Sequence, residues 1–156
     1  MSRKIICAAD FNETSRWAVS HAAQMARVRG AELVLCHFID SPYRYAREMV
    51  YAAPGSDAQV LMGPEVQRDY EERLREFCGG RLEGRVRLVV KDGAPEVEIL
   101  RLARRERPDV LFIGQGRECA PRVLARARCP VGVATGPHRF VLSGAGAEGV
   151  RQAAAA

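Results

Sequence analysis

The sequence has no long apolar run and no closely spaced pair of cysteines. No stretch approaches the roughly 20 apolar residues that a helix needs to cross a bilayer, so we expect a cytoplasmic protein and not a membrane protein. The five cysteines are an odd number without any Cys-x-x-Cys spacing, and they predict neither a disulfide framework nor a metal site. Cys7 and Cys36 lie within apolar segments, where we expect them to be small buried side chains.

Lysine is nearly absent, since Lys4 and Lys91 are the only two among 24 basic residues. The net charge of +5 is matched by a local excess in residues 101–128, which hold three acids and eight arginines: Arg101, Arg104, Arg105, Arg107, Arg117, Arg122, Arg126 and Arg128. Such an excess can attract nucleic acid, a phosphate-bearing ligand or an acidic partner. Because no known nucleic-acid-binding motif or aromatic platform accompanies the arginines, we expect them to solvate helix faces and do not expect nucleic-acid binding.

Apolar segments of strand length alternate with helical patterns along the 156 residues, a length that suits one core. The predicted strands are residues 5–9, 31–39, 84–90, 109–114 and 130–134. Because crossovers between parallel strands are right-handed, this alternation predicts a doubly wound α/β fold with helices on both faces. We expect a five-stranded parallel sheet of order 3-2-1-4-5. We expect residues 1–135 to form this single domain and residues 136–156 to be a Gly/Ala-rich tail, in which only Phe140–Leu142 resembles an added edge strand.

Capping residues mark where the helices begin and end. Asn12 is placed to accept a backbone hydrogen bond at the start of the first helix, and Gly30 can adopt the left-handed conformation at its end. Pro64 and Pro95 suit the first turn of two later helices. The segment Ser41–Gly63 has no such pattern, and we expect it to be a covering loop or a short helix.

The predicted strand order reverses between the first and the fourth strand. In an open parallel sheet, ligands bind at such a reversal, next to the carboxyl ends of the strands. Asp10 follows the first strand and Gly114 ends the fourth, so we expect these two residues to flank a crevice. The residues in that crevice therefore decide which ligand the chain can hold.

Several segments, taken in order, resemble the universal stress protein family: Lys4–Thr14, Leu33–Phe38, Gly93–Leu100, Asp109–Gly114 and Cys129–Val133. The resemblance covers residues 3–135 and implies an adenine-nucleotide-hydrolase-like α/β sandwich. It also implies that, in a nucleotide-binding member, adenine and ribose would pack near Ala9, Asp10 and Phe38. Members of the family commonly pair through the last strand, which implies a homodimer whose interface includes Val131, Gly132, Val133 and Ala134.

The chain departs from the family at the loop that follows the fourth strand. In nucleotide-binding members this loop has the pattern G-x2-G-x9-G-[ST] and holds the phosphates. Here a much shorter connection, beginning Gly114-Gln115-Gly116, leads into the last helix, and no serine or threonine occurs from Gly114 to Ala134. A phosphate cradle needs glycines that let main-chain N–H groups approach, together with a hydroxyl or a helix N-terminus. Arg117 and Arg122 would supply charge to an anion, but we do not expect ATP to bind in the family's usual way.

Individual side chains leave alternatives open. Asp10 would either contact a ligand or bond the turn that precedes the first helix. We expect His37 to be a hydrogen-bonded core residue, and Cys119 would suit a redox sensor if the neighbouring arginines stabilised its thiolate. No serine, histidine and acid have the spacing that a catalytic triad requires, so we predict no catalytic residues.

Together these observations predict a non-enzymatic stress-response protein that acts as a homodimer and through contacts with another protein, without a cofactor or a metal. The alternative is a sensor of adenosine, AMP or ATP in the crevice between the first and the fourth strand. Its ligand would contact Asp10, Phe38, Gly114 and Gly116, with Arg117 or Arg122 on the phosphate. An enzymatic hydrolase is the weakest alternative, because the sequence has no coherent set of a general base and metal ligands.

Overall fold

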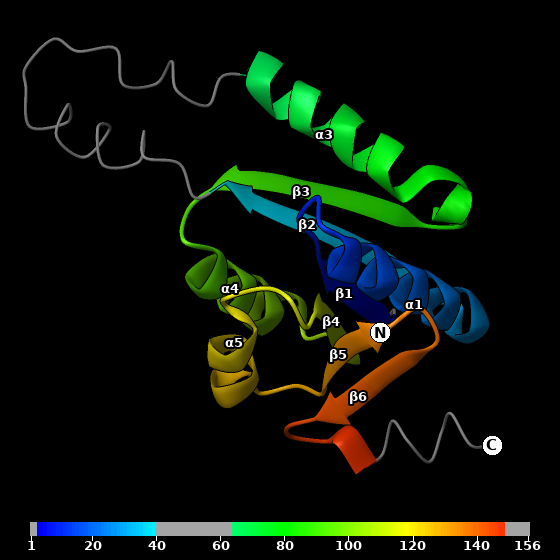
Figure 1. The fold of residues 1–156 in the computed structure, drawn as a ribbon, viewed down its shortest axis with the longest axis vertical. Helices are drawn as coiled ribbons and strands as arrows, with labels where there is room; N and C mark the ends of the chain where they lie inside the picture. The colour runs from blue at the N-terminus through cyan, green and yellow to red at the C-terminus, as the bar shows by residue number, and fades with distance from the viewer. Residues whose placement is uncertain (1–2, 40–63, 149–156) are drawn as a thin grey trace, which may run out of the picture.

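Figure 1 shows the computed structural model of the chain, which describes residues 3–39 and 64–148. The predicted loop or helix at Ser41–Gly63 lies outside these residues. The strands are β1 (Lys4–Ala8), β2 (Glu32–Ile39), β3 (Val86–Asp92), β4 (Val110–Gly114), β5 (Val131–Gly136) and β6 (Arg139–Ser143). The helices are α1 (Glu13–Arg29), α3 (Pro64–Cys78), α4 (Pro95–Glu106) and α5 (Ala120–Arg126), with a short 3₁₀ helix η2 (Gly79–Arg81).

The strands form one mixed sheet in the order β3-β2-β1-β4-β5-β6. The first five strands run parallel, and among themselves they follow the order 3-2-1-4-5. The prediction of a five-stranded, all-parallel sheet is nevertheless wrong, because β6 adds a sixth strand that pairs antiparallel with β5. β6 also lies within residues 136–156, which the sequence indicated as a tail.

β6 joins the sheet because one of its faces is apolar. The ring of Phe140 packs edge-on against that of Phe112, with centroids 5.2 Å apart, and lies 4.9 Å from the ring of His21 on α1. Leu142 is buried, whereas Val141 between them is half exposed. The two-residue connection from β5 is short enough to return the chain as a hairpin. Burial of the apolar face therefore favours a paired strand over a loose tail.

The helices cover both faces of the sheet, α1 and α3 on one and α4 and α5 on the other (Figure 1). Successive side chains of β1 alternate between the two resulting cores. Ile5 and Cys7 belong to the cluster under α1, and Ile6 and Ala8 belong to the cluster under α4. This alternation within a continuously apolar strand is the arrangement expected of a sheet that is covered on both sides.

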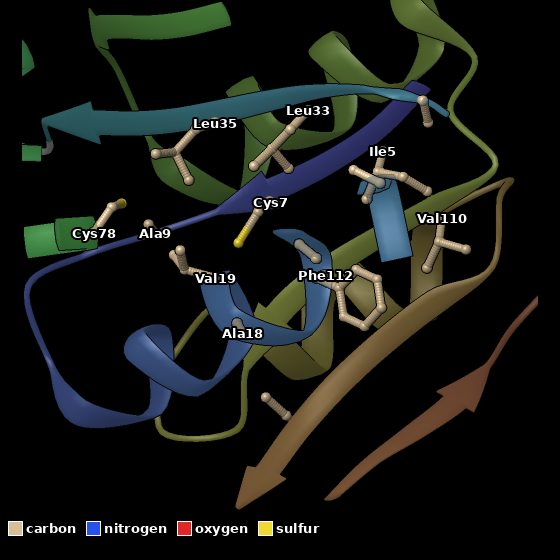
Figure 2. Packing of buried hydrophobic residues seen from close by; sticks show 14 of the residues in the cluster. Ile5, Cys7, Ala9, Ala18, Val19, Leu33, Leu35, Cys78, Val110 and Phe112 are labelled. Carbon is tan, nitrogen blue, oxygen red and sulfur yellow. The ribbon is translucent and has the colours of Figure 1, made fainter. Parts of the chain in front are cut away.

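α1 lies close to the sheet because its inner face consists of small residues. Ala18, Ala22 and Ala26 are buried, and Figure 2 shows Ala18 facing Cys7 of the neighbouring strand. At the start of the helix, Oδ1 of Asn12 accepts a hydrogen bond of 2.9 Å from the N–H of Ser15. At its end, Gly30 has a φ of 60°. Both capping predictions are confirmed.

Cysteines and acids form no metal-binding cluster in the part of the chain that the structure describes. All five cysteines are free, and Cys7 and Cys36 are fully buried as predicted. Within residues 3–39 and 64–148, no group of three or more histidine, cysteine, aspartate or glutamate side chains could hold a metal ion. The helices in those same ranges are too short or too polar to cross a membrane.

Candidate functional site

β1 and β4 lie side by side in the sheet, with Ile6 opposite Leu111 and Ala8 opposite Ile113. Their carboxyl ends therefore meet at one edge, where the order of the strands reverses. A hollow of about 520 Å³ opens at this edge, and we call it the central hollow. Its walls are Asp10, the start of α4 (residues 94–96), the loop of residues 116–119, and Arg122 on α5.

Four of the residues predicted for the site line the central hollow, namely Asp10, Gly116, Arg117 and Arg122. The other three do not line it. Ala9 belongs to the apolar cluster under α1, Phe38 belongs to the cluster under α4, and Gly114 is the buried last residue of β4. Phe38 is therefore a core residue in this structure and does not form a wall of the hollow.

The carboxylate of Asp10 is held within the turn that leads into α1. Its Oδ1 accepts hydrogen bonds of 2.9 Å from the N–H of Asn12 and from Oγ of Ser15. Its Oδ2 accepts a third, of 3.1 Å, from Nδ2 of Asn12. The N–H of Asp10 donates in return to Oγ of Ser15 at 3.0 Å. The sequence left two roles open for Asp10, contact with a ligand and hydrogen bonding within the turn. These contacts correspond to the second role.

Arg117 is buried beside Asp10. Its Nε lies 3.5 Å from Oδ2 of Asp10, and only 6% of its side chain is exposed. Its Nη1 is also buried and has no hydrogen-bond partner among the described residues. Buried donors nearly always have a partner, so this nitrogen is an unusual feature of the hollow. The loop thus turns a positive charge inward, against the end of β1.

The thiols near Arg117 stay protonated. Burial raises the pKa of Cys119, and the charge of Arg117 opposes that rise only in part. Burial likewise raises the pKa of Cys36 to about 12, with Arg117 again opposing. A stabilised thiolate, which a redox sensor at Cys119 would require, is therefore not favoured by these surroundings.

The loop after β4 packs directly on the first turn of α1. A Cβ atom at Gly114 would lie 2.5 Å from Oγ1 of Thr14 and 2.8 Å from the backbone nitrogen of Ser15, which leaves room for glycine only. The N–H of Gly116 donates to Oγ1 of Thr14 at 3.2 Å. The two glycines therefore serve a tight strand-to-helix turn, and the loop's own atoms lie against the N-terminus of α1.

Arg122 is also paired within the chain. Its Nη1 lies 2.8 Å and 2.9 Å from the two carboxylate oxygens of Glu96, which joins α5 to the first turn of α4. The walls of the central hollow carry two arginines against three carboxylates, those of Asp10, Glu96 and Glu118. The formal charge of its walls is thus −1, which does not favour a phosphate.

An aromatic cluster borders the end of β1 on the α3 side, and the sequence analysis missed it. The ring of His37 lies 5.0 Å from that of Phe11 and stacks on Tyr70 at 5.7 Å. Nδ1 of His37 donates to the carbonyl of Ala9 at 2.8 Å, and burial lowers the pKa of this histidine, so it is a neutral core residue as predicted. Arg73 lies over the rings of Phe11 and Tyr70. No local pattern signals this cluster, because Phe11 and Tyr70 are far apart in sequence.

Comparisons with known proteins agree with this architecture. The model of the universal stress protein family matches residues 1–134. Among curated proteins, the chain is similar to universal stress protein MJ0577 of Methanocaldococcus jannaschii, with 23% identity over 124 residues, which span 73% of this chain and 76% of that protein.

Solved structures of the same family are similar in fold. The structure of the hypothetical protein MJ0577 has a TM-score of 0.62 and 21% identity, and the match covers 86% of this chain and 96% of that one. A universal stress protein in complex with cAMP has a TM-score of 0.57 and 17% identity, over 85% of this chain and 95% of that one. The universal stress protein from Archaeoglobus fulgidus in complex with dAMP has a TM-score of 0.54 and 22% identity, over 84% and 96%.

Proposed function

The chain belongs to the universal stress protein family, and we propose that it serves the stress response by contacting another protein, without binding a nucleoside triphosphate. One observation carries this proposal: the guanidinium of Arg117 is buried beside Asp10, at the reversal of the strand order. The chain's own side chain thus takes up space and charge at the sheet edge where ligands of such folds bind.

The main chain after β4 supports the same proposal. A triphosphate needs several N–H groups that point into the site. The N–H groups of Gln115, Gly116 and Arg117 already donate to Ala134, Thr14 and Gly114. The N–H of Ala120 donates to the carbonyl of Arg117, and Pro121 has none. Few donors in this loop are left for a phosphate.

Calorimetry of the full chain with magnesium-ATP tests the proposal. We expect no binding tighter than about 1 mM, the affinity that corresponds to about 4 kcal/mol. A dissociation constant in the low micromolar range would overturn the proposal. The same titration with magnesium and buffer alone corrects for the heat of dilution.

The proposal includes a homodimer, for which we propose an edge other than the last parallel strand. The predicted residues, Val131 to Ala134, pair with β4 on one side and with β6 on the other. A second copy would reach them only after β6 had left the sheet. In the described residues β6 has β5 as its sole neighbour in the sheet, and Val141 of β6 is half exposed. We therefore place the pairing edge at β6.

A sensor of an adenine mononucleotide is the second candidate. Two of the similar structures were solved with cAMP and with dAMP. In this chain, the unpartnered Nη1 of Arg117 borders a hollow of about 520 Å³, a volume within the range of small-molecule sites. A monophosphate needs fewer donors than a triphosphate, so a buried guanidinium suits it better. Calorimetry with AMP separates this candidate from the first, because the first predicts no binding of AMP.

A further inference from the structure

The eight arginines of residues 101–128 fall into two groups. Four of them lie within 4 Å of a carboxylate: Arg101 with Glu98, Arg105 with Glu106, Arg117 with Asp10, and Arg122 with Glu96. The side chains of the other four have no ion pair or hydrogen bond with any described residue: Arg104, Arg107, Arg126 and Arg128. All four of the second group line one hollow of about 390 Å³. The sequence shows a basic stretch, and the fold gathers its unpaired members at one place.

This hollow lies between α4 and α5, which pack side by side (Figure 1), near the C-terminal ends of both helices. Its remaining walls are mostly apolar and include Leu100, Ala103 and Pro108. A smaller hollow of about 190 Å³ shares Leu100, Arg104 and Arg126 with it and continues along α4 to Val97, which is 46% exposed. We call the two hollows together the α4–α5 groove. It combines an apolar floor with unpaired positive charge.

Helix dipoles explain part of this charge but not all of it. Each helix C-terminus carries about half a negative unit charge, so the two helices together attract about one positive charge, and α5 has only seven residues. The four unpaired arginines carry more positive charge than the two helix C-termini attract. One of them, Arg107, ends α4 with a φ of 50°, a left-handed conformation in which glycine is the usual residue. Arginine at this position adds to the charge of the groove at a cost to the backbone.

We propose that the α4–α5 groove docks an acidic segment of a partner protein, with one aliphatic side chain of that segment on Leu100 and acidic side chains on the four unpaired arginines. This inference rests on the proposed function, and it gives the partner a chemical class. α4 has 12 residues and is about 18 Å long, a length that matches an extended peptide of about five or six residues.

The lining of the groove favours a peptide over a nucleic acid. None of the residues that line the two hollows is aromatic. Single-stranded nucleic acids bind chiefly by stacking their bases on aromatic rings, in addition to contacts with phosphates. An aliphatic side chain, in contrast, gains from burial on Leu100 and Val97.

Fluorescence anisotropy with a labelled peptide tests the proposal. The probe is the hexapeptide Asp-Glu-Glu-Leu-Asp-Glu, and the matched control is Asn-Gln-Gln-Leu-Asn-Gln. With the full chain we expect the acidic peptide to bind with a dissociation constant of about 10–100 μM at low salt, and to bind more weakly as salt screens the charges. Replacing its leucine by glycine weakens binding about fivefold or more.

Variants of the protein locate the binding. Arg104→Glu with Arg126→Glu weakens binding of the acidic peptide by about tenfold or more. The matched control, Arg68→Glu with Arg75→Glu on the exposed side of α3, makes the same change in net charge and alters binding by less than about twofold. If circular dichroism shows that the glutamate variant is unfolded, Arg104→Gln with Arg126→Gln replaces it and is expected to weaken binding by about threefold or more.

Several results would overturn the proposal: equal binding of the acidic and the neutral peptide, equal loss in the groove and the control variants, or tighter binding of a single-stranded oligonucleotide with the same number of charges. The results that overturn the groove proposal can be distinguished from the result that overturns the proposed function. Tight binding of magnesium-ATP in the central hollow would refute the proposed function and leave the peptide titration unchanged. The smaller part of the groove shares Glu96 and Arg122 with that hollow, but none of the four unpaired arginines lines it.

Discussion

Nε of Arg117 lies 3.5 Å from Oδ2 of Asp10, although 107 residues separate the two in the sequence. The contact places the guanidinium of Arg117 at the edge of the sheet between β1 and β4, where it lines the central hollow. The same loop donates its N–H groups to its own chain, through Thr14, Gly114 and Ala134. These contacts give the proposed loss of triphosphate binding a structural cause that goes beyond the short length of the loop.

The variant Arg117→Ala separates the charge of the hollow from its main-chain donors. We expect it to bind magnesium-ATP no better than the parent chain, because the variant removes a guanidinium but supplies no N–H groups. We also expect its free energy of unfolding to be about 1–2 kcal/mol lower than that of the parent chain, since a buried side chain and its contact with Asp10 are lost. Calorimetry and urea denaturation measure the two effects. Micromolar binding of ATP by the variant would show that Arg117 alone blocks a competent site, and Arg117→Lys serves as the control that keeps the charge.

Gly114→Ala tests the close contact of the loop with α1. The added Cβ would lie 2.5 Å from Oγ1 of Thr14 and 2.6 Å from its backbone carbonyl carbon. We expect a loss of about 2–3 kcal/mol in the free energy of unfolding, because the backbone of α1 must shift. Urea denaturation measures it. The matched control is Gly80→Ala, where no atom lies within 4 Å of the new Cβ, and its effect should stay below about 0.5 kcal/mol.

Glu106 makes the stability of the fold depend on pH. Its carboxylate accepts from Lys4 at 2.6 Å and pairs with Arg87 at 2.9 Å, and it is 8% exposed. The hydrogen bond from Lys4 is the largest cause that lowers the pKa of this carboxyl below its usual 4.5. The folded state thus binds this proton less tightly than the unfolded state. The stability that Glu106 provides is therefore complete above about pH 4.5 and is lost as the pH falls through the lower pKa of the folded state.

Glu106→Gln checks this dependence. At pH 7 we expect the variant to be less stable by about 1–3 kcal/mol, and we expect the difference from the parent chain to shrink as the pH falls below 4.5. Urea denaturation from pH 7 to pH 3 measures it. Glu98→Gln is the control, because Glu98 pairs with the exposed Arg101, and it should change stability by less than about 0.5 kcal/mol. A difference that is constant across this range of pH would contradict the assignment.

Val141→Lys tests the outer edge of β6 as the site of pairing between copies. A lysine on an edge strand opposes pairing with another chain, so we expect the variant to be a monomer at concentrations at which the parent chain is a dimer. Light scattering coupled to size-exclusion chromatography measures the mass. Val28→Lys on α1 is the control, since Val28 is 77% exposed and away from the sheet. A dimer that survives Val141→Lys would place the interface elsewhere.

Much of the fold followed from local patterns in the sequence. The continuous apolar runs predicted the first five strands, and their alternation with helical patterns predicted a doubly wound parallel arrangement for them. Asn12 and Gly30 predicted the ends of α1 because the hydrogen bonds of a cap form between residues a few positions apart. The absence of glycine, serine and threonine from residues 117–131 is likewise visible without coordinates.

Other features became visible only in three dimensions. The sequence offered Phe140–Leu142 only as a segment resembling an added edge strand, whereas the contacts of Phe140 with Phe112 and His21, which hold β6 on the sheet, join residues that are far apart in the chain. The sequence left Phe38 open as a core residue or as a contact for a nucleotide, and the structure places it in the core under α4. The burial of the Arg117 side chain likewise depends on its contact with Asp10, a residue far from it in the sequence.

The amino-acid sequence by itself determined the five parallel strands and the caps of α1, because these depend on residues that are close together along the chain. Only the tertiary structure decided which arginines find carboxylates and which four remain unpaired around the α4–α5 groove. Coulomb attraction depends on the distance between two charges in space, and the packing of whole helices on the sheet sets that distance for each arginine and its nearest carboxylate.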